Sequence, residues 1–263
     1  MLKCILQVAG VAGILGCAMA TDALKEVANE LAPTGRMRVA INFGNSVLAQ
    51  RDPLDGQPRG VSADLARELS RRLGVPLDFV IYNGAGAVTD ALKSGAWDVC
   101  FLAIDPVRSA GIDFTAPYVV IEGTYIVPAD SKLTEIADVD RDGVRIAVGR
   151  GSAYDLFLTR TLKHAQLIRE PTSAAALEAF LALRLEAAAG VRQPLMVFAG
   201  SHPDLRVYPG RFMQIEQAVG TPIGRPAAVR YLKSFVEEMK SSGFVALALK
   251  SSGQGEATVA PTE

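Results

Sequence analysis

The 263-residue chain has only three cysteines and two histidines, and none of them is spaced as a metal site requires. His164 and His202 stand alone in the sequence. Cys100 lies in the apolar run 99–102, where a single cysteine is usually a small buried side chain rather than a nucleophile. The other two cysteines fall within the first twenty residues. We therefore expect no metal and no cofactor.

An excess of positive charge is also lacking. The chain has 27 lysines and arginines against 28 aspartates and glutamates, so nothing attracts phosphates, and nucleic-acid binding is excluded. Neither a G-x-S-x-G elbow nor a C-x-x-C pair occurs. A dinucleotide-binding motif is excluded at 149–154, because Tyr154 stands where glycine is required. The hydrophobic share of 49% is typical of a globular protein, and the length suits two lobes of about 100 residues each.

The first twenty residues have the pattern of an export signal. Lys3 gives a positive start, residues 5–15 are apolar, and Ala18-Met19-Ala20 is a small-residue cleavage site. The apolar run is too short to span a bilayer, which takes about 20 residues. We expect the protein in the periplasm with the segment 1–20 removed. Lipid attachment through Cys17, or a retained apolar helix on a cytosolic protein, are the alternatives.

Hydrophobic periodicity predicts strands and helices in alternation. Apolar residues recur at every second position over 36–43, typical of a strand, and at every fourth position over 61–73, typical of a helix. The pattern continues with a strand at 77–82, a short helix at 88–92 and a strand at 99–104. This order implies right-handed crossovers and a parallel sheet, with a ligand crevice at the carboxyl ends of the strands.

The same order starts again further along the chain. Strands are expected at 145–148, 166–168 and 185–189, with helices at 153–163 and 173–183. Two α/β units therefore lie in tandem. Extended segments at 118–127 and 215–219 are long enough to cross between them, and the helices at 227–240 and 244–250 return to the first unit. The expected division is a first lobe of 33–123 and 219–250, a second lobe of 124–218, and a disordered tail at 251–263 with little to bury.

Arg108 is the most informative single residue. It follows the strand 99–104 directly, at the edge where a parallel sheet binds its ligands. A guanidinium there can hold a carboxylate through two parallel hydrogen bonds. The alternative is a surface arginine paired with Asp113.

The turn Gly149-Arg150-Gly151-Ser152 joins a strand to the start of a helix. Its backbone N–H groups are suited to an anion, although a plain glycine turn with Ser152 as the N-cap is the favoured reading. Asp105 and Glu122 are the acids that we place near the crevice, since one ends a strand and the other lies on a crossing segment. Each has an alternative role as a capping or hinge residue.

Several stretches together resemble the bacterial extracellular solute-binding proteins of family 3, the polar amino-acid binders of ABC importers. The matching stretches are Gly60-Val61-Ser62-Ala63-Asp64-Leu65-Ala66, Ala91-Leu92-Lys93-Ser94-Gly95-Ala96-Trp97-Asp98-Val99, Pro106-Val107-Arg108, Asp113-Phe114-Thr115-Ala116-Pro117-Tyr118, the segment 144–152 and Ser242-Gly243-Phe244. The resemblance covers most of the chain after Gly35, and its specificity lies in the order and spacing of the stretches.

The resemblance implies an α/β, two-lobed periplasmic-binding-protein-like fold of type II. Each lobe then has a parallel-rich sheet flanked by helices, and two hinge crossings join the lobes. It also implies that Arg108 binds the α-carboxylate of the ligand, helped by the backbone around Ala103 and by Ser152 and Ala153 from the opposite lobe. Asn42 and Ala85 complete the expected set of ligand-binding residues, together with Asp105 and Glu122.

The departures from the family pattern concern the rest of the ligand. Ala85 and the region 46–48 stand where family members carry aromatic residues that sandwich the ligand. Asp105 replaces a common threonine or serine, and Val191 stands where an acid usually holds the ammonium group. We therefore expect that the part of the binding site that holds the ligand carboxylate is the same as in the family. The part that holds the other end of the ligand should differ, with Asp105 or Glu122 contacting a cation or a hydroxyl group there.

The sequence thus predicts a monomeric, non-enzymatic binding protein that closes around a small carboxylate-bearing solute and presents it to the membrane subunits of an ABC importer. The alternative is an enzyme on the same fold, such as a cyclohexadienyl (prephenate or arogenate) dehydratase-like lyase with Asp105 or Glu122 as general acid. A sensory module would need an output domain, and the chain contains none.

Overall fold

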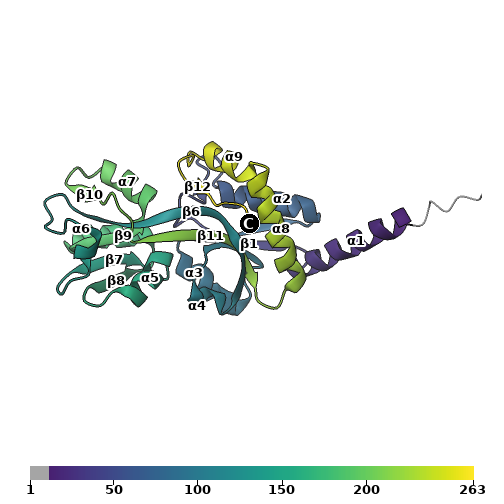
Figure 1. Cartoon of the computed structure of the whole chain (residues 1–263), viewed down its shortest axis with the longest axis horizontal. Helices are drawn as coiled ribbons and strands as arrows, with labels where there is room; N and C mark the ends of the chain where they lie inside the picture. The colour runs from purple at the N-terminus through teal and green to yellow at the C-terminus, as the bar shows by residue number, and fades with distance from the viewer. Residues whose placement is uncertain (1–11) are drawn as a thin grey trace, which may run out of the picture.

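The computed structural model describes residues 12–263 and has two lobes joined by two long strands (Figure 1). The first lobe contains the strands β1 (Met37–Asn42), β2 (Gln50–Arg51), β3 (Pro58–Arg59), β4 (Leu77–Tyr82), β5 (Val99–Ala103) and β12 (Thr258–Val259), the helices α1 (Ala12–Leu31), α2 (Val61–Leu73), α3 (Ala85–Asp90), α4 (Pro106–Ser109), α8 (Pro226–Ser241) and α9 (Phe244–Ser251), and a 3₁₀ turn at Ala91–Ser94. The second lobe contains β7 (Arg145–Gly149), β8 (Gln166–Glu170), β9 (Ala187–Val191), β10 (Leu205–Val207), α5 (Ala153–Thr161), α6 (Ser173–Ala182), α7 (Arg192–Gly200) and a 3₁₀ turn at Ile136–Val139. The connecting strands are β6 (Ile112–Pro128) and β11 (Met213–Pro222).

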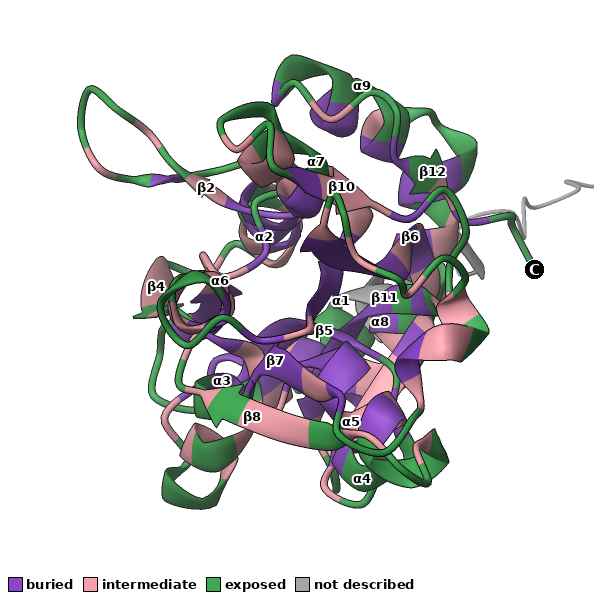
Figure 2. Cartoon of the chain, turned by 90° about the vertical axis from the view of Figure 1, so that its left-hand side faces the viewer, coloured by how far each residue is buried: buried purple, intermediate pink, exposed green. Residues whose placement is uncertain are grey.

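Each lobe is built around a central parallel strand, as the alternating sequence pattern predicts. In the first lobe β1 pairs in parallel with β4 and β5, and in the second lobe β7 pairs in parallel with β8 and β9. Every residue of β5 and β9 is buried, and Figure 2 shows buried residues along the inner strands while the outer face of α9 is exposed. The carboxyl ends of β1, β5 and β9 reach the cavity where the two lobes meet.

The crossing strands form a long antiparallel ladder whose register shifts at Gln217–Ala218 and at Ala218–Gly220. β6 and β11 pair from Ile112 opposite Pro222 to Gly123 opposite Met213, and β6 then continues alone into the second lobe to pair with β9. The predicted crossing segments, 118–127 and 215–219, lie within these two strands. The fold is therefore the two-lobed α/β arrangement that the sequence predicts.

The spacing of apolar residues in helix α2 determines which face of the helix is buried. Val61, Leu65 and Leu69 recur on one face and are completely buried, as the four-residue spacing requires. The helix ends at Gly74, whose φ of 64° is the left-handed conformation that glycine adopts without a steric cost.

The tail from Ser251 is ordered, in contrast to the expectation of disorder. β12 pairs with Val119 and Val120 of β6, and the side chains of Ala257 and Ala260 are buried. Lys240 donates a 2.7 Å hydrogen bond from Nζ to the carbonyl oxygen of Pro261. The tail itself has few apolar residues. Its order comes from strand β6, whose edge has backbone N–H and C=O groups with which the tail forms hydrogen bonds.

We expect removal of this tail to destabilise the protein. A chain that ends at Gly253 loses β12 and its buried side chains, and its free energy of unfolding should fall by about 1 to 3 kcal/mol. A chain that ends at Pro261 keeps β12 and serves as the control. Urea denaturation followed by circular dichroism measures both, and equal stability of the two shortened chains would contradict the pairing.

The beginning of the export-signal segment, residues 1–11, lies outside the described residues. Its remainder forms the start of α1, which extends away from the first lobe in Figure 1. Near the end of α1, Val27 and Leu31 are buried, and Glu30 Oε2 accepts a 2.7 Å hydrogen bond from the backbone N–H of Ala228 at the start of α8. Within residues 12–263, no helix combines the length and the apolar character needed to cross a membrane.

Candidate ligand-binding cleft

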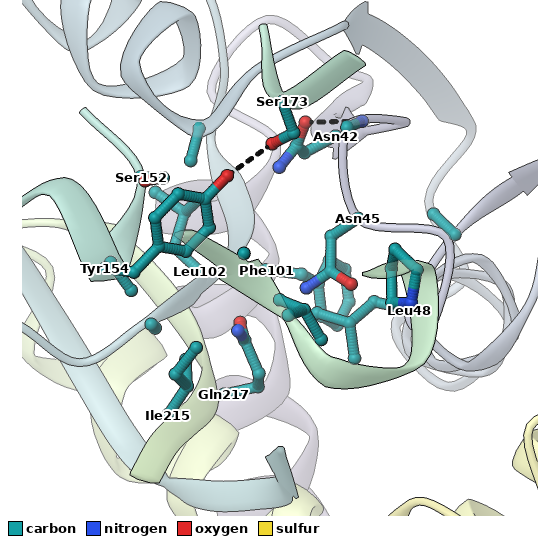
Figure 3. Close-up of a pocket in the computed structure, with 18 of the residues that line it drawn as sticks. Asn42, Asn45, Leu48, Phe101, Leu102, Ser152, Tyr154, Ser173, Ile215 and Gln217 are labelled. Carbon is teal, nitrogen blue, oxygen red and sulfur yellow. Dashed lines mark hydrogen bonds between the residues drawn. The ribbon is translucent and has the colours of Figure 1, made fainter. Parts of the chain in front are cut away.

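A cavity lies between the two lobes at the carboxyl ends of the parallel strands. Asn42, Asn45 and Phe101 reach it from the first lobe, and Ser152, Tyr154 and Ser173 reach it from the second (Figure 3). Ile215 and Gln217 of the crossing strand β11 form another part of its wall. The crevice is therefore where the strand order places it.

Six of the eight predicted site residues line this cavity. They are Asn42, Ala85, Ala103, Arg108, Ser152 and Ala153. Val191, which stands in place of the expected acid, also lines it. The two acids, Asp105 and Glu122, do not.

Arg108 is buried between the lobes, with 4% of the residue exposed. Its Nη1 donates a 2.8 Å hydrogen bond to the carbonyl oxygen of Ala103, and its Nη2 donates a 2.8 Å hydrogen bond to that of Gly151 in the opposite lobe. Its Nε is buried and has no hydrogen-bond partner among residues 12–263. The alternative of a surface arginine paired with Asp113 is wrong, because Arg108 is buried and donates to the carbonyl groups of Ala103 and Gly151.

Arg108 forms no salt bridge with a carboxylate of residues 12–263. Both of its hydrogen-bond partners are neutral carbonyl groups, and burial lowers the pKa of the guanidinium to about 10, although the charge of Asp105 opposes this at longer range. A guanidinium has five N–H donors, so three remain after these two bonds. A buried cation of this kind is stabilised by an anion that reaches it.

Asp105 does not line the cavity, contrary to its predicted role. Its side chain accepts a 2.9 Å hydrogen bond from the backbone N–H of Val107 and so caps α4. Its other oxygen accepts a 2.9 Å hydrogen bond from Arg160 Nη2 on α5 of the second lobe. The capping role, which was the alternative for this residue, is the one that the structure has, with an ion pair between the lobes in addition.

Glu122 is also occupied elsewhere. Arg211 Nη1 and Arg192 Nε each donate a 2.6 Å hydrogen bond to its carboxylate. These two arginines, Arg211 first, lower the pKa of the Glu122 carboxyl. The residue is therefore an ionised anchor on the crossing strand β6 and does not meet a ligand in the cavity.

The glycine turn before α5 uses most of its own N–H groups. The backbone N–H of Arg150 donates a 2.8 Å hydrogen bond to the carbonyl oxygen of Glu170, and that of Gly151 donates one of 2.8 Å to Asp155 Oδ2. Ser152 Oγ caps the helix by accepting a 3.1 Å hydrogen bond from the backbone N–H of Asp155. The reading of Ser152 as an N-cap is therefore confirmed. The first-turn N–H groups of Ala153 and Tyr154 have no intrahelical acceptor, as at any helix start, and both residues line the cavity.

Two glycines from opposite lobes, Gly86 and Gly151, lie in close contact. An added Cβ on Gly86 of α3 would lie 2.5 Å from the carbonyl oxygen of Arg150, and one on Gly151 would lie 2.6 Å from the Cα of Gly86. Gly151 also has a φ of +68°. This contact, the hydrogen bond from Arg108 to Gly151 and the ion pair of Asp105 with Arg160 all join the two lobes beside the cavity.

Sequence reasoning missed several wall residues. Phe101, Tyr154, Ser173 and Gln217 all line the cavity. Phe101 and Tyr154 place aromatic rings there although Ala85 and 46–48 do not. Phe101 could have been predicted as a wall residue, because it lies two residues before Ala103 and so points to the same side of β5.

Two α/β lobes, two crossing strands and a cleft at the strand ends define the type II periplasmic binding proteins. Residues 49–251 match the model of the bacterial extracellular solute-binding proteins, family 3, and the chain belongs to this family. No curated protein sequence matches the chain.

Several solved structures with the same fold are amino-acid-binding proteins. The solute receptor for L-cysteine of Neisseria gonorrhoeae has a TM-score of 0.75 at 20% identity, covering 86% of this chain and 92% of that chain. An amino acid ABC transporter substrate-binding protein from Streptococcus pneumoniae, bound to L-arginine, has a TM-score of 0.74 at 18% identity, covering 86% and 97%. An ancestral amino acid-binding protein, described as a precursor of cyclohexadienyl dehydratase, has a TM-score of 0.71 at 23% identity, covering 85% and 97%. At these identities the likeness establishes the fold.

Proposed function

We propose that this protein is the periplasmic solute-binding component of an ABC importer and that it closes around a small solute bearing a carboxylate. The observation that carries the proposal is the buried guanidinium of Arg108, which lines the cleft between the lobes and, among residues 12–263, bonds only to neutral carbonyl groups. Family membership supports the solute-binding role.

The surroundings of Arg108 favour an anion over a neutral ligand. Charge-assisted hydrogen bonds are worth about 1.5 to 3 kcal/mol each. The start of α5 adds the partial positive charge of a helix N-terminus close to Ala153 on the same cavity wall. A carboxylate between the two lobes would therefore compensate the buried charge and hold both lobes at once.

The dehydratase-like alternative loses the residues on which it depended. Asp105 and Glu122 were the expected general acids, and both are bound by arginines outside the cavity. A general acid must donate its proton to the substrate within hydrogen-bond distance. The resemblance to a precursor of cyclohexadienyl dehydratase is one of fold, and we propose binding without turnover.

Matched acids and primary amides test the proposal. We expect a carboxylic acid that fits the cleft to raise the melting temperature, while its primary amide does not, because a neutral amide leaves the charge of Arg108 uncompensated. Differential scanning fluorimetry over a panel of such pairs measures this. Equal stabilisation by acid and amide would show that the site does not recognise a carboxylate.

A further inference from the structure

The cavity wall carries one charged side chain, that of Arg108, among the residues that the structure describes. The remaining polar wall groups are amides and hydroxyls. No aspartate or glutamate of residues 12–263 lines the cavity, and the two acids predicted for the site, Asp105 and Glu122, are bound by arginines outside it. The wall therefore offers a counter-charge to an anion but none to a cation.

Two asparagines on the wall turn their donor ends to the ligand. Asn42 Oδ1 accepts a 2.9 Å hydrogen bond from the backbone N–H of Gly44, and Asn45 Oδ1 accepts one of 3.3 Å from that of Val47. Because a backbone N–H is always a donor, each amide oxygen is fixed toward it. Figure 3 shows the bond at Asn42 as a dashed line, with the amide nitrogen on the other side. The side-chain NH₂ group of each asparagine is thus available to donate hydrogen bonds to a ligand.

The hydroxyl groups of Ser152, Tyr154 and Ser173 on the wall also form hydrogen bonds within the protein. Ser152 Oγ accepts from the N–H of Asp155 at 3.1 Å, which leaves its hydrogen free to be donated. Tyr154 and Ser173 share a 2.7 Å hydrogen bond between their hydroxyl groups (Figure 3). The side chain of Gln217 has no hydrogen bond to residues 12–263, so it can present either end of its amide to a ligand.

From this excess of donors we propose that the cleft selects a small organic acid that carries oxygen acceptors and no ammonium group. An ammonium brings three donors and a positive charge, and among the described side chains of this wall there is no carboxylate, while the asparagine oxygens already accept backbone N–H groups. A keto or hydroxyl oxygen beside the carboxylate meets the NH₂ groups of Asn42 and Asn45 instead. The inference rests on the proposed function, since it assumes that the carboxylate binds at Arg108.

Val191 offers a direct way to change this selectivity. It is the last residue of β9, lines the cavity and occupies the N-cap position of α7 without a side-chain capping bond. Aspartate and asparagine are both favoured N-cap residues, so Val191→Asp and Val191→Asn should both fold. The two variants differ in the charge that they place at the wall.

The experiment compares matched acids that differ only in the group beside the carboxylate. The probes are alanine, lactate and pyruvate, and phenylalanine, phenyllactate and phenylpyruvate, measured by isothermal titration calorimetry. We expect the best keto or hydroxy acid to bind the natural protein roughly tenfold or more tightly than its amino acid. Val191→Asp should reduce or reverse this preference, and Val191→Asn should retain it.

The outcomes separate the selectivity from the proposed function. Tighter binding of the amino acids to the natural protein overturns the selectivity and leaves the carboxylate site standing. An unchanged preference in Val191→Asp also overturns it, because the missing acid would not then be what rejects the ammonium. If no acid of either series binds, the proposed carboxylate site is itself wrong.

Discussion

Replacing Arg108 with glutamine is expected to lower the affinity for the carboxylate ligand by about 100-fold or more, because two charge-assisted hydrogen bonds of about 1.5 to 3 kcal/mol each are lost. The fold should persist. The substitution removes a buried charge whose partners are the carbonyl groups of Ala103 and Gly151, and burial disfavours that charge, as its lowered pKa indicates. Isothermal titration calorimetry measures the affinity, and thermal unfolding checks the fold.

The matched control for this substitution is Arg150→Gln. Arg150 is an exposed arginine on the neighbouring glycine turn, so the variant removes the same charge without touching the cavity wall. Its affinity should stay close to that of the natural protein. Similar losses in the two variants would indicate that only the general positive field of the cleft matters.

Gly86→Ala is expected to keep the lobes from closing. The new Cβ would lie 2.5 Å from the carbonyl oxygen of Arg150, which is backbone and cannot rotate away. Alanine is the better residue within a helix, so α3 itself should not suffer. We expect ligand affinity to fall by about tenfold or more, because contacts from both lobes contribute only in the closed form.

Two measurements separate this effect from a general loss of stability. Small-angle X-ray scattering with ligand should show a smaller decrease in the radius of gyration for Gly86→Ala than for the natural protein. Gly200→Ala, in α7 with open space around the new Cβ, is the control and should close normally. Undiminished closure of Gly86→Ala would mean that the contact between Gly86 and the glycine turn is not part of the closed form.

The alternation of elements could be predicted because it follows from local hydrophobic periodicity. The position of Arg108 followed as well, since a residue directly after a buried parallel strand lies at the edge where the crevice forms. The strand β9 ends at Val191 rather than at residue 189, and that shift places Val191 at the cavity wall. The tail could not be predicted, because its pairing partner β6 lies more than a hundred residues away.

The two acids were misplaced for a similar reason. Asp105 is paired with an arginine 55 residues further on, and Glu122 with one 70 residues further on. Nothing local to either acid identifies its partner. The orientation of Asn42, in contrast, had a local signal, because asparagine often bonds the backbone two residues ahead, as it does here with Gly44.

A crystal structure of the protein with its tightest-binding acid tests the role of Arg108 most directly. We predict the ligand carboxylate between the lobes, with an oxygen about 2.7 to 2.9 Å from a guanidinium nitrogen of Arg108. A carboxylate that points to solvent, while Arg108 binds only the carbonyl groups of Ala103 and Gly151, would contradict the carboxylate site.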